Sequence, residues 1–295
     1  MNYQERIVLF IDILGFKDLL NDTVDKEGNE IQSGIDKVTE AYDSIRDVWD
    51  LDKVDSKHKF LKRTSKQTKR ITIFSDCIVI SFSAKEKSEI FYTLLEVKWM
   101  ILRLIYKGIL CRGAITYGKL VHTDKFLFGP ALVEAYILES KAANYPRVIL
   151  DRSIIELAGE ARVDNHTPEE EMEYVESLLE KDLDGMYYID YFAKAQDELD
   201  DPQYDFPNYI QLLGNKIRSG MNSSKHPNKA DIRVKYIWMK EKYNRMVEMS
   251  KEKTFLNALK DNGEDELFDF YKELKKINPA HSTDLPLVGS KGKKN

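Results

Sequence analysis

One stretch decides the fold: Phe10-Ile11-Asp12-Ile13-Leu14-Gly15-Phe16, in which a carboxylate lies in an apolar run that a glycine ends. Residues 7–13 have the length and composition of a buried strand. A carboxylate among so many apolar side chains is costly unless it is paired or bound to a metal. Gly15 would let the backbone approach a phosphate, and a helix predicted from Lys17 offers free N–H groups to the same anion.

A second carboxylate, Asp76, follows Phe74-Ser75 and precedes Cys77. It separates two β-rich stretches, residues 70–74 and 77–82, so the short gap predicts a hairpin turn. If the hairpin pairs next to the first strand, Asp12 and Asp76 meet and can share two divalent cations. The alternative for each aspartate is an unrelated structural cap or turn residue.

Helices and strands alternate along the first two thirds of the chain. Helices are predicted at 32–50, 88–106 and 130–142, and further strands at 109–120, 126–129 (strand or turn), 147–150 and 186–192. This order lacks the regular βαβ rhythm of a doubly wound sheet. We therefore expect an α+β fold with a mixed sheet covered by helices.

The character of the sequence changes near residue 195. Residues 212–218, 232–249 and 266–277 are helical by pattern, and Pro202, Pro207 and Pro227 punctuate the predicted linkers. These features predict a core domain at 1–193, a helical extension at 194–282 and a disordered tail at 283–295.

Residues 52–70 are rich in lysine and arginine. One interpretation is a solvated insertion, and the other is a surface that contacts a nucleotide or a regulator. Both interpretations stay open at the level of sequence.

The composition argues against several classes of protein, although it does not exclude a local basic patch. The formal net charge of −5 argues against a nucleic-acid partner. The two cysteines, Cys77 and Cys111, lie in apolar runs without a zinc motif, which predicts free thiols in a reducing compartment. No apolar run approaches the roughly 18 residues of a membrane span, and the N-terminus lacks a secretory pattern. We expect a soluble, cytoplasmic protein.

The two aspartate motifs resemble those of class III nucleotidyl cyclases, and the resemblance covers about residues 5–192. Residues 111–118, Cys-Arg-Gly-Ala-Ile-Thr-Tyr-Gly, resemble that family's strand with two glycines, and Phe128-Gly129-Pro130-Ala131 resembles its Trp-Gly segment. The resemblance implies a ferredoxin-like βαββαβ core and a head-to-tail homodimer with active sites at the interface. It also implies two Mn²⁺ or Mg²⁺ ions per active site, with metal ligands at Asp12, Ile13 and Asp76. Gly15 and Phe16 would contact phosphate through the backbone, the alternative being a plain turn with a core aromatic.

The residues that would read the base depart from the family. Thr72 and Phe126 stand at the two base-reading positions, so neither the lysine–aspartate pair of adenylate cyclases nor the glutamate–cysteine pair of guanylate cyclases is present. A purine reader without these groups would lose about 1–3 kcal/mol for each unmet hydrogen bond. An aromatic at the second position favours a smaller base, and Tyr136 is a further pocket candidate. The alternative for all three is ordinary packing.

The family's transition-state asparagine and arginine align with Val133 and Ile137, which are both apolar. A substitute for this charge clamp must come from other basic residues. For Arg112 and Arg147, the alternative to contact with the triphosphate or pyrophosphate is a structural ion pair. For Arg112 the partner would be a core carboxylate such as Glu139. The remaining candidates are surface lysines, and the full set is Arg112, Lys141, Arg147 and Lys181.

The pattern is similar to the bacterial pyrimidine cyclases of the Pycsar anti-phage systems, in its Arg112–Gly118 and Gly129–Glu139 segments. This resemblance implies synthesis of cyclic UMP or cyclic CMP. UTP is the expected substrate in preference to CTP, an order that follows from the family and not from any residue here. The product would activate a separate effector protein that harms the infected cell.

Two other functions stay open. One is an adenylate or guanylate cyclase with an atypical base pocket, and the other is a catalytically silent sensor domain that binds a nucleotide. The five histidines are scattered, mostly in polar surroundings, and we assign them no catalytic role.

Overall fold

The computed structural model describes residues 2–49 and 68–278. The chain divides into two compact units, Met1–Tyr191 and Phe192–Asn295. Most of the basic segment 52–70, and all of the predicted tail 283–295, lie outside the described residues.

The first unit contains a mixed sheet, which in the described residues has eight strands. Seven of them run in the order β2-β3-β1-β4-β6-β8-β7, and β5 pairs with β4. β4 and β6 are parallel, while the other pairs are antiparallel. The strands are β1 (Gln4–Leu14), β2 (Arg70–Phe74), β3 (Cys77–Ser83), β4 (Leu110–His122), β5 (Leu127–Phe128), β6 (Val148–Leu150), β7 (Leu179–Lys181) and β8 (Tyr187–Ile189).

The central strand, β1, is apolar on both faces because both are covered. Side chains alternate along a strand, so Ile7, Leu9 and Ile11 line one face, and all are at most 1% exposed. Val8 and Phe10 line the other face, and Asp12 follows them in the same row. This alternation aims the carboxylate at one side of the sheet.

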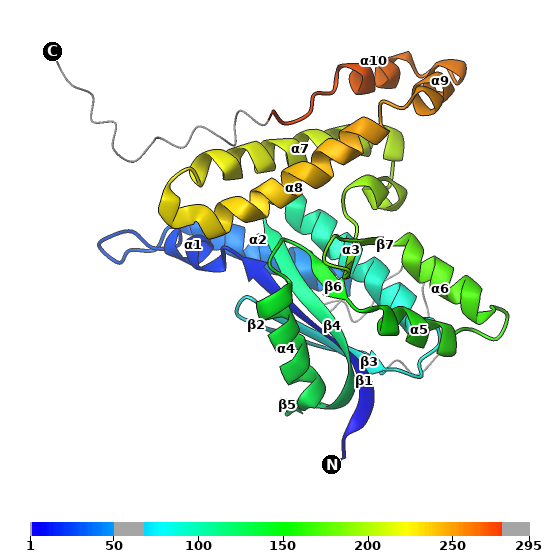
Figure 1. Cartoon of the computed structure of the whole chain (residues 1–295). Coiled ribbons are helices and arrows are strands. Elements are labelled where there is room, and N and C mark those ends of the chain that lie inside the picture. Colours follow the sequence, from blue (N-terminus) through cyan, green and yellow to red (C-terminus); the bar gives the residue numbers. More distant parts are fainter. Residues whose placement is uncertain (1, 50–67, 279–295) are drawn as a thin grey trace. The chain divides into compact units, whose positions relative to one another are not determined.

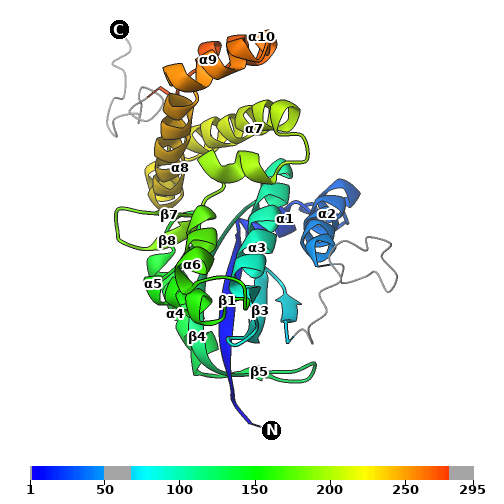
Figure 2. The same ribbon diagram turned by 90° about the vertical axis from the view of Figure 1, so that its right-hand side faces the viewer.

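Helices cover both faces of the sheet. α4 packs on β1 and β4, where Ala131 and Ala135 join Val8 and Val79 in one buried cluster. α2 and α3 lie on the opposite side (Figure 2), and α5 and α6 pack beside α3. In Figure 1, α4 lies alongside β4. The helices of this unit are α1 (Phe16–Asn21), α2 (Gln32–Val48), α3 (Glu89–Tyr106), α4 (Pro130–Ala142), α5 (Arg152–Glu160) and α6 (Pro168–Ser177).

The start of α4 depends on a close backbone contact. Gly129 has φ +155°, and a Cβ there would lie 2.5 Å from the carbonyl oxygen of Lys119. Pro130 then occupies the first turn, where its missing N–H has no helical partner to lose. Glycine followed by proline therefore turns the chain sharply from the sheet into the helix.

The second unit is helical, with α7 (Pro202–Ser223), α8 (Ala230–Met249), α9 (Lys253–Asp261) and α10 (Asp265–Glu273), and short 3₁₀ turns at Ala193–Glu198 and Pro227–Lys229. α7 and α8 pack tightly, since a Cβ on Gly220 would lie 2.1 Å from the ring of Tyr236. Within the described ranges, no helix combines the length and the apolar composition needed to cross a bilayer.

The predicted fold class is confirmed: an α+β arrangement, with a mixed sheet covered by helices and C-terminal helices. Three local predictions were wrong or incomplete. Pro207 lies inside α7 and not in a linker: Asp201 caps the helix, Pro202 is its first residue, and Pro207 follows in its second turn. β7 and α9 were missed because each is short: β7 has three residues, and α9, although amphipathic, has nine.

Candidate active site

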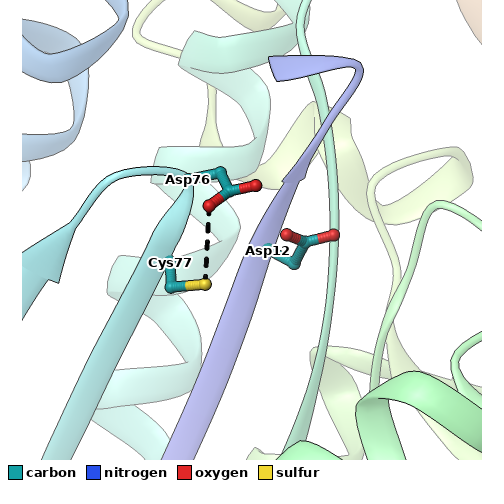
Figure 3. A group of neighbouring side chains, drawn as sticks. All are labelled: Asp12, Asp76 and Cys77. Carbon is teal, nitrogen blue, oxygen red and sulfur yellow. Dashed lines mark hydrogen bonds between the residues drawn. The ribbon is translucent and has the colours of Figure 1, made fainter. Parts of the chain in front are cut away.

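The two predicted carboxylates converge. Asp12 lies near the end of β1, and Asp76 occupies the turn between β2 and β3 (Figure 3). Ligand atoms of Asp12, Asp76 and Cys77 all lie within 4.8 Å of one another, and all three residues are partly exposed. The main-chain N–H of Ile13 donates to the carbonyl of Asp76 at 2.9 Å, which ties the hairpin turn to β1.

The donor chemistry of this cluster fits a hard divalent cation. Burial, followed by the charges of Asp76 and Asp12, raises the pKa of the Cys77 thiol to about 12. The thiol is therefore protonated at neutral pH, and it donates to Asp76 Oδ1 at 3.7 Å. Carboxylate oxygens without a thiolate suit Mg²⁺ or Mn²⁺ better than zinc. Asp12 and Asp76 would hold the cation.

Arg112 adjoins the carboxylates from the other side of β1. It stands opposite Asp12 in the β1–β4 register, and its Nε donates to Asp12 Oδ2 at 3.2 Å. The same Nε lies 2.6 Å from Oε1 of Glu139, a buried residue of α4. This geometry favours the structural alternative for Arg112, an ion pair with Glu139, and adds a contact with Asp12.

An apolar pocket of about 530 Å³ lies beside the carboxylates. It shares Cys77 with the acidic cluster, and the predicted base-pocket residues Thr72 and Tyr136 both line it. The ring of Tyr136 packs edge-on against Phe10, with centroids 5.6 Å apart. The complete lining is Phe10, Thr72, Phe74, Cys77, Val79, Leu127, Leu132, Val133 and Tyr136.

Phe126, the other predicted base-reading residue, does not line this pocket. It lies in the turn before β5 with 49% of its surface exposed, while its neighbour Leu127 reaches the pocket. Val133 and Ile137, at the positions of the family's charge clamp, are exposed on α4.

His122 is a residue that sequence reasoning missed. The side chain is only 7% exposed at the end of β4, and its two hydrogen-bond partners are polar. Nε2 lies 2.9 Å from Thr72 Oγ1, and Nδ1 lies 2.8 Å from Ser81 Oγ. Burial, then the charges of Arg6 and Arg70, lowers the pKa of His122 to about 4. The period-two spacing from Arg112 to His122 along β4 could have indicated that both face the same side.

Gly15 and Phe16 adopt the positions of a turn and a core aromatic. Gly15 precedes α1 with φ +77°, and the Phe16 side chain is buried against Tyr42 of α2. The hydroxyl of Tyr42 donates to the carbonyl of Ser75 at 2.6 Å, which supports the turn that carries Asp76. A phosphate contact through the backbone here stays a prediction.

The remaining basic candidates lie in different surroundings. Arg147 is buried, and its guanidinium pairs with Asp182 and Asp184, which favours the structural alternative. Lys181 lies on edge strand β7, four steps from β1 or roughly 19 Å at normal strand spacing, with its Nζ over the Tyr187 ring. Lys141 is exposed in the last turn of α4.

No protein-family model matches this chain, and no curated protein matches its sequence. Solved structures show a distant similarity to class III adenylyl cyclases. Two structures of a bacterial light-regulated adenylyl cyclase are 14% and 15% identical to this chain, with TM-scores of 0.33 and 0.34. Each match covers 52% of this chain; the first covers 79% of the matched structure's chain and the second covers 45%. A class III adenylyl cyclase-like ATP-binding protein from Pseudomonas aeruginosa is 14% identical, with a TM-score of 0.36 and coverage of 60% and 44%. The chain thus spans less than half the length of the last two structures, and no residue role rests on these matches.

Proposed function

We propose that this chain is a nucleotidyl cyclase that converts a pyrimidine nucleoside triphosphate, UTP or CTP, to its cyclic monophosphate and pyrophosphate. The observation that carries the proposal is the convergence of Asp12 and Asp76 within 4.8 Å, beside an apolar pocket that shares Cys77 with them and is large enough for a base. The element order from β1 to β4 is β-α-α-β-β-α-β, with strand order β2-β3-β1-β4. Apart from the short additional helix α1, this order agrees with the ferredoxin-like core that the sequence resemblance implies.

The reaction needs positioning and charge stabilisation more than a protein base. The ribose 3′-oxygen attacks the α-phosphorus, the bond to the β-phosphate oxygen breaks, pyrophosphate leaves and the hydroxyl proton passes to solvent. Two bound divalent cations would assist loss of that proton and neutralise the triphosphate. Asp12 and Asp76 would hold the cations, and Arg112 would orient Asp12. Arg112 is then a positioning residue, and the exposed Lys141 is a candidate for triphosphate contact.

The pocket supports a pyrimidine substrate. Its walls are apolar and aromatic except for Thr72 and the protonated Cys77. A purine would leave polar edge atoms without partners against these walls, at about 1–3 kcal/mol each. A pyrimidine presents fewer such atoms.

The surface around the pocket supports a homodimer. Large apolar side chains on α4 and on the β2–β3 hairpin are exposed, with Phe74 at 77%, Val133 at 57% and Ile137 at 44%. A second copy of the chain placed over this face would bury them and close the pocket mouth. Signalling through a separate effector in anti-phage defence rests on the sequence resemblance alone.

The experiment is incubation of the full chain with each of the four NTPs and Mn²⁺ or Mg²⁺, with products identified by mass spectrometry. Cyclic UMP or cyclic CMP should form, and Asp12→Asn and Asp76→Asn should each lower turnover by at least about a hundredfold. Asp36→Asn, on the exposed side of α2, is the matched control and should retain full activity.

Other outcomes would redirect the assignment. Turnover of ATP or GTP alone would replace the pyrimidine substrate with a purine. Nucleotide binding without product from any of the four NTPs would favour the silent sensor.

A further inference from the structure

A chain of three hydrogen bonds runs beneath the apolar pocket. Arg6 Nε donates to Ser81 Oγ at 2.9 Å, Ser81 Oγ lies 2.8 Å from His122 Nδ1, and His122 Nε2 lies 2.9 Å from Thr72 Oγ1. This series of hydrogen bonds begins at Arg6 on β1 and passes through Ser81 on β3 and His122 at the end of β4. It ends at Thr72 on β2, in the pocket wall.

The direction of this chain follows from its first member. Arg6 is a guanidinium and can only donate, so Ser81 Oγ accepts from it. Ser81 is fully buried, and in the described part of the chain the only acceptor for its own hydroxyl proton is Nδ1 of His122. Leaving that proton without an acceptor would cost about 1–3 kcal/mol. Nδ1 therefore accepts.

The next hydrogen bond has His122 as its donor and Thr72 as its acceptor. Its lowered pKa, caused first by burial and then by Arg6 and Arg70 and opposed by Asp124, leaves one ring proton at neutral pH. With Nδ1 accepting, that proton is on Nε2 and is donated to Thr72 Oγ1. A second ring proton would not reverse the last bond, since Nε2 would still donate.

Thr72 is left with a hydroxyl proton to give. Among the described residues its Oγ1 has no partner besides His122, and the residue lines the pocket. Thr72 pairs with Val79 in the β2–β3 register, one side-chain step, or roughly 7 Å, beyond the Phe74–Cys77 pair that adjoins the carboxylates. It thus faces the part of the pocket farther from the metal residues, where the distal edge of a bound base would lie.

We propose that Thr72 donates its hydroxyl proton to the distal edge of the base, so that the pocket favours a carbonyl oxygen there over an amino group. The proposal rests on the cyclase function proposed above and names its substrate. Uracil presents O4 at that edge, and O4 accepts the hydroxyl proton. Cytosine presents an N4 amino group, which can donate to the second lone pair of Thr72 Oγ1 but leaves the hydroxyl proton without an acceptor. UTP is then the substrate in preference to CTP.

The test compares UTP and CTP by kcat/KM in matched variants. The parent should favour UTP by at least about tenfold, the effect expected of one satisfied hydrogen bond against one unsatisfied donor. Thr72→Val, which keeps the shape and removes the hydroxyl, should lower UTP turnover about tenfold and leave CTP turnover nearly unchanged. Thr72→Ser should restore the preference, and Thr39→Val on the exposed side of α2 should not alter it.

His122 variants test the direction of the chain rather than the presence of the hydroxyl. His122→Gln can accept from Ser81 and donate to Thr72, so the UTP preference should persist. His122→Glu places an acceptor beside Thr72 that takes its hydroxyl proton and leaves only lone pairs for the base, so the ratio of UTP to CTP turnover should fall several-fold. A purely structural role would lower both activities equally and leave their ratio unchanged in every variant, which would overturn the proposal.

Failure of this proposal can be separated from failure of the cyclase assignment. If CTP is cyclised as well as or better than UTP, the enzyme stands and the donor assignment is wrong. If no product forms, calorimetric binding of UTP and CTP in the presence of Ca²⁺ makes the same comparison. Equal binding, or binding of neither nucleotide, refutes the base preference.

Discussion

Asp12 and Arg112 lie directly opposite each other on neighbouring antiparallel strands, and Arg112 Nε donates to Asp12 Oδ2 at 3.2 Å. The same Nε contacts Glu139 at 2.6 Å. A carboxylate proposed to hold a cation is therefore oriented by an arginine that is itself held by a buried glutamate on α4. Asp12 and Arg112 face the same side of the sheet, as directly paired residues do.

Removal of Arg112 should destabilise the fold through Glu139. Arg112→Ala takes a charge partner from a carboxylate that is nearly buried, and we expect a loss of about 3 kcal/mol in the free energy of unfolding. The double variant Arg112→Ala/Glu139→Gln should recover most of this loss, as measured by urea denaturation. Equal stabilities of the parent and the single variant would show that the pair is unimportant.

The acidic cluster should bind Mn²⁺ without any nucleotide. Calorimetry or electron paramagnetic resonance should detect an ion whose affinity falls at least about tenfold in Asp76→Asn, because one of the carboxylates near it loses its charge. Cys77→Ser should bind Mn²⁺ about as well as the parent, since the thiol is protonated. A stronger effect of the cysteine variant than of the aspartate variant would contradict the assignment of the ligands.

Gly113 should be intolerant of a side chain. A Cβ there would lie 2.7 Å from the carbonyl oxygen of Phe10, so Gly113→Ala must push β4 away from β1, one residue beyond the Asp12–Arg112 pair. We expect a loss of about 1–3 kcal/mol in the free energy of unfolding and a parallel loss of turnover. An unchanged denaturation midpoint would mean that the two strands separate easily.

His122 should make stability depend on pH. Its folded pKa of about 4 lies below the ordinary value of 6.5, so the unfolded state binds the proton more tightly. The contribution of neutral His122 to the free energy of unfolding is complete above pH 6.5. It falls as the pH is lowered from 6.5 to 4, and below pH 4 it changes little further. Its size is at most about 3 kcal/mol.

The measurement is the free energy of unfolding of the parent and of His122→Gln at pH 7 and pH 4.5. Comparison of the two proteins cancels the titration of carboxylates common to both. The parent should lose more stability than the variant on acidification, and a parallel loss in both would rule out His122 as the source.

The proposed dimer should depend on the exposed apolar side chains of α4. Ile137→Glu places a charge at the centre of that surface and should convert a dimer to a monomer in light scattering, with loss of turnover. Leu183→Glu, at a fully exposed position in the β7–β8 turn, is the matched control and should leave both unchanged. A parent protein that is monomeric and active would remove the dimer from the proposal.

The sequence by itself determined the apolar run of β1 with Asp12 near its end, the hairpin that carries Asp76, and the boundaries of α4 at Pro130 and Ala142. These features follow from local chemistry: strand periodicity, turn residues, and proline in a first helical turn. The α+β class followed from the order of such elements.

Only the tertiary structure decided which polar side chains meet. The contacts of Arg147 with Asp182 and of His122 with Thr72 join residues 35 and 50 positions apart. The sequence offered Glu139 only as one example of a core carboxylate for Arg112, and the structure makes that contact at 2.6 Å. The identity of such partners depends on strand register and on the packing of helices over the sheet, and no local pattern encodes either. The direction of the hydrogen bonds that end at Thr72 is likewise a property of the assembled network, since each donor is set by the partner before it.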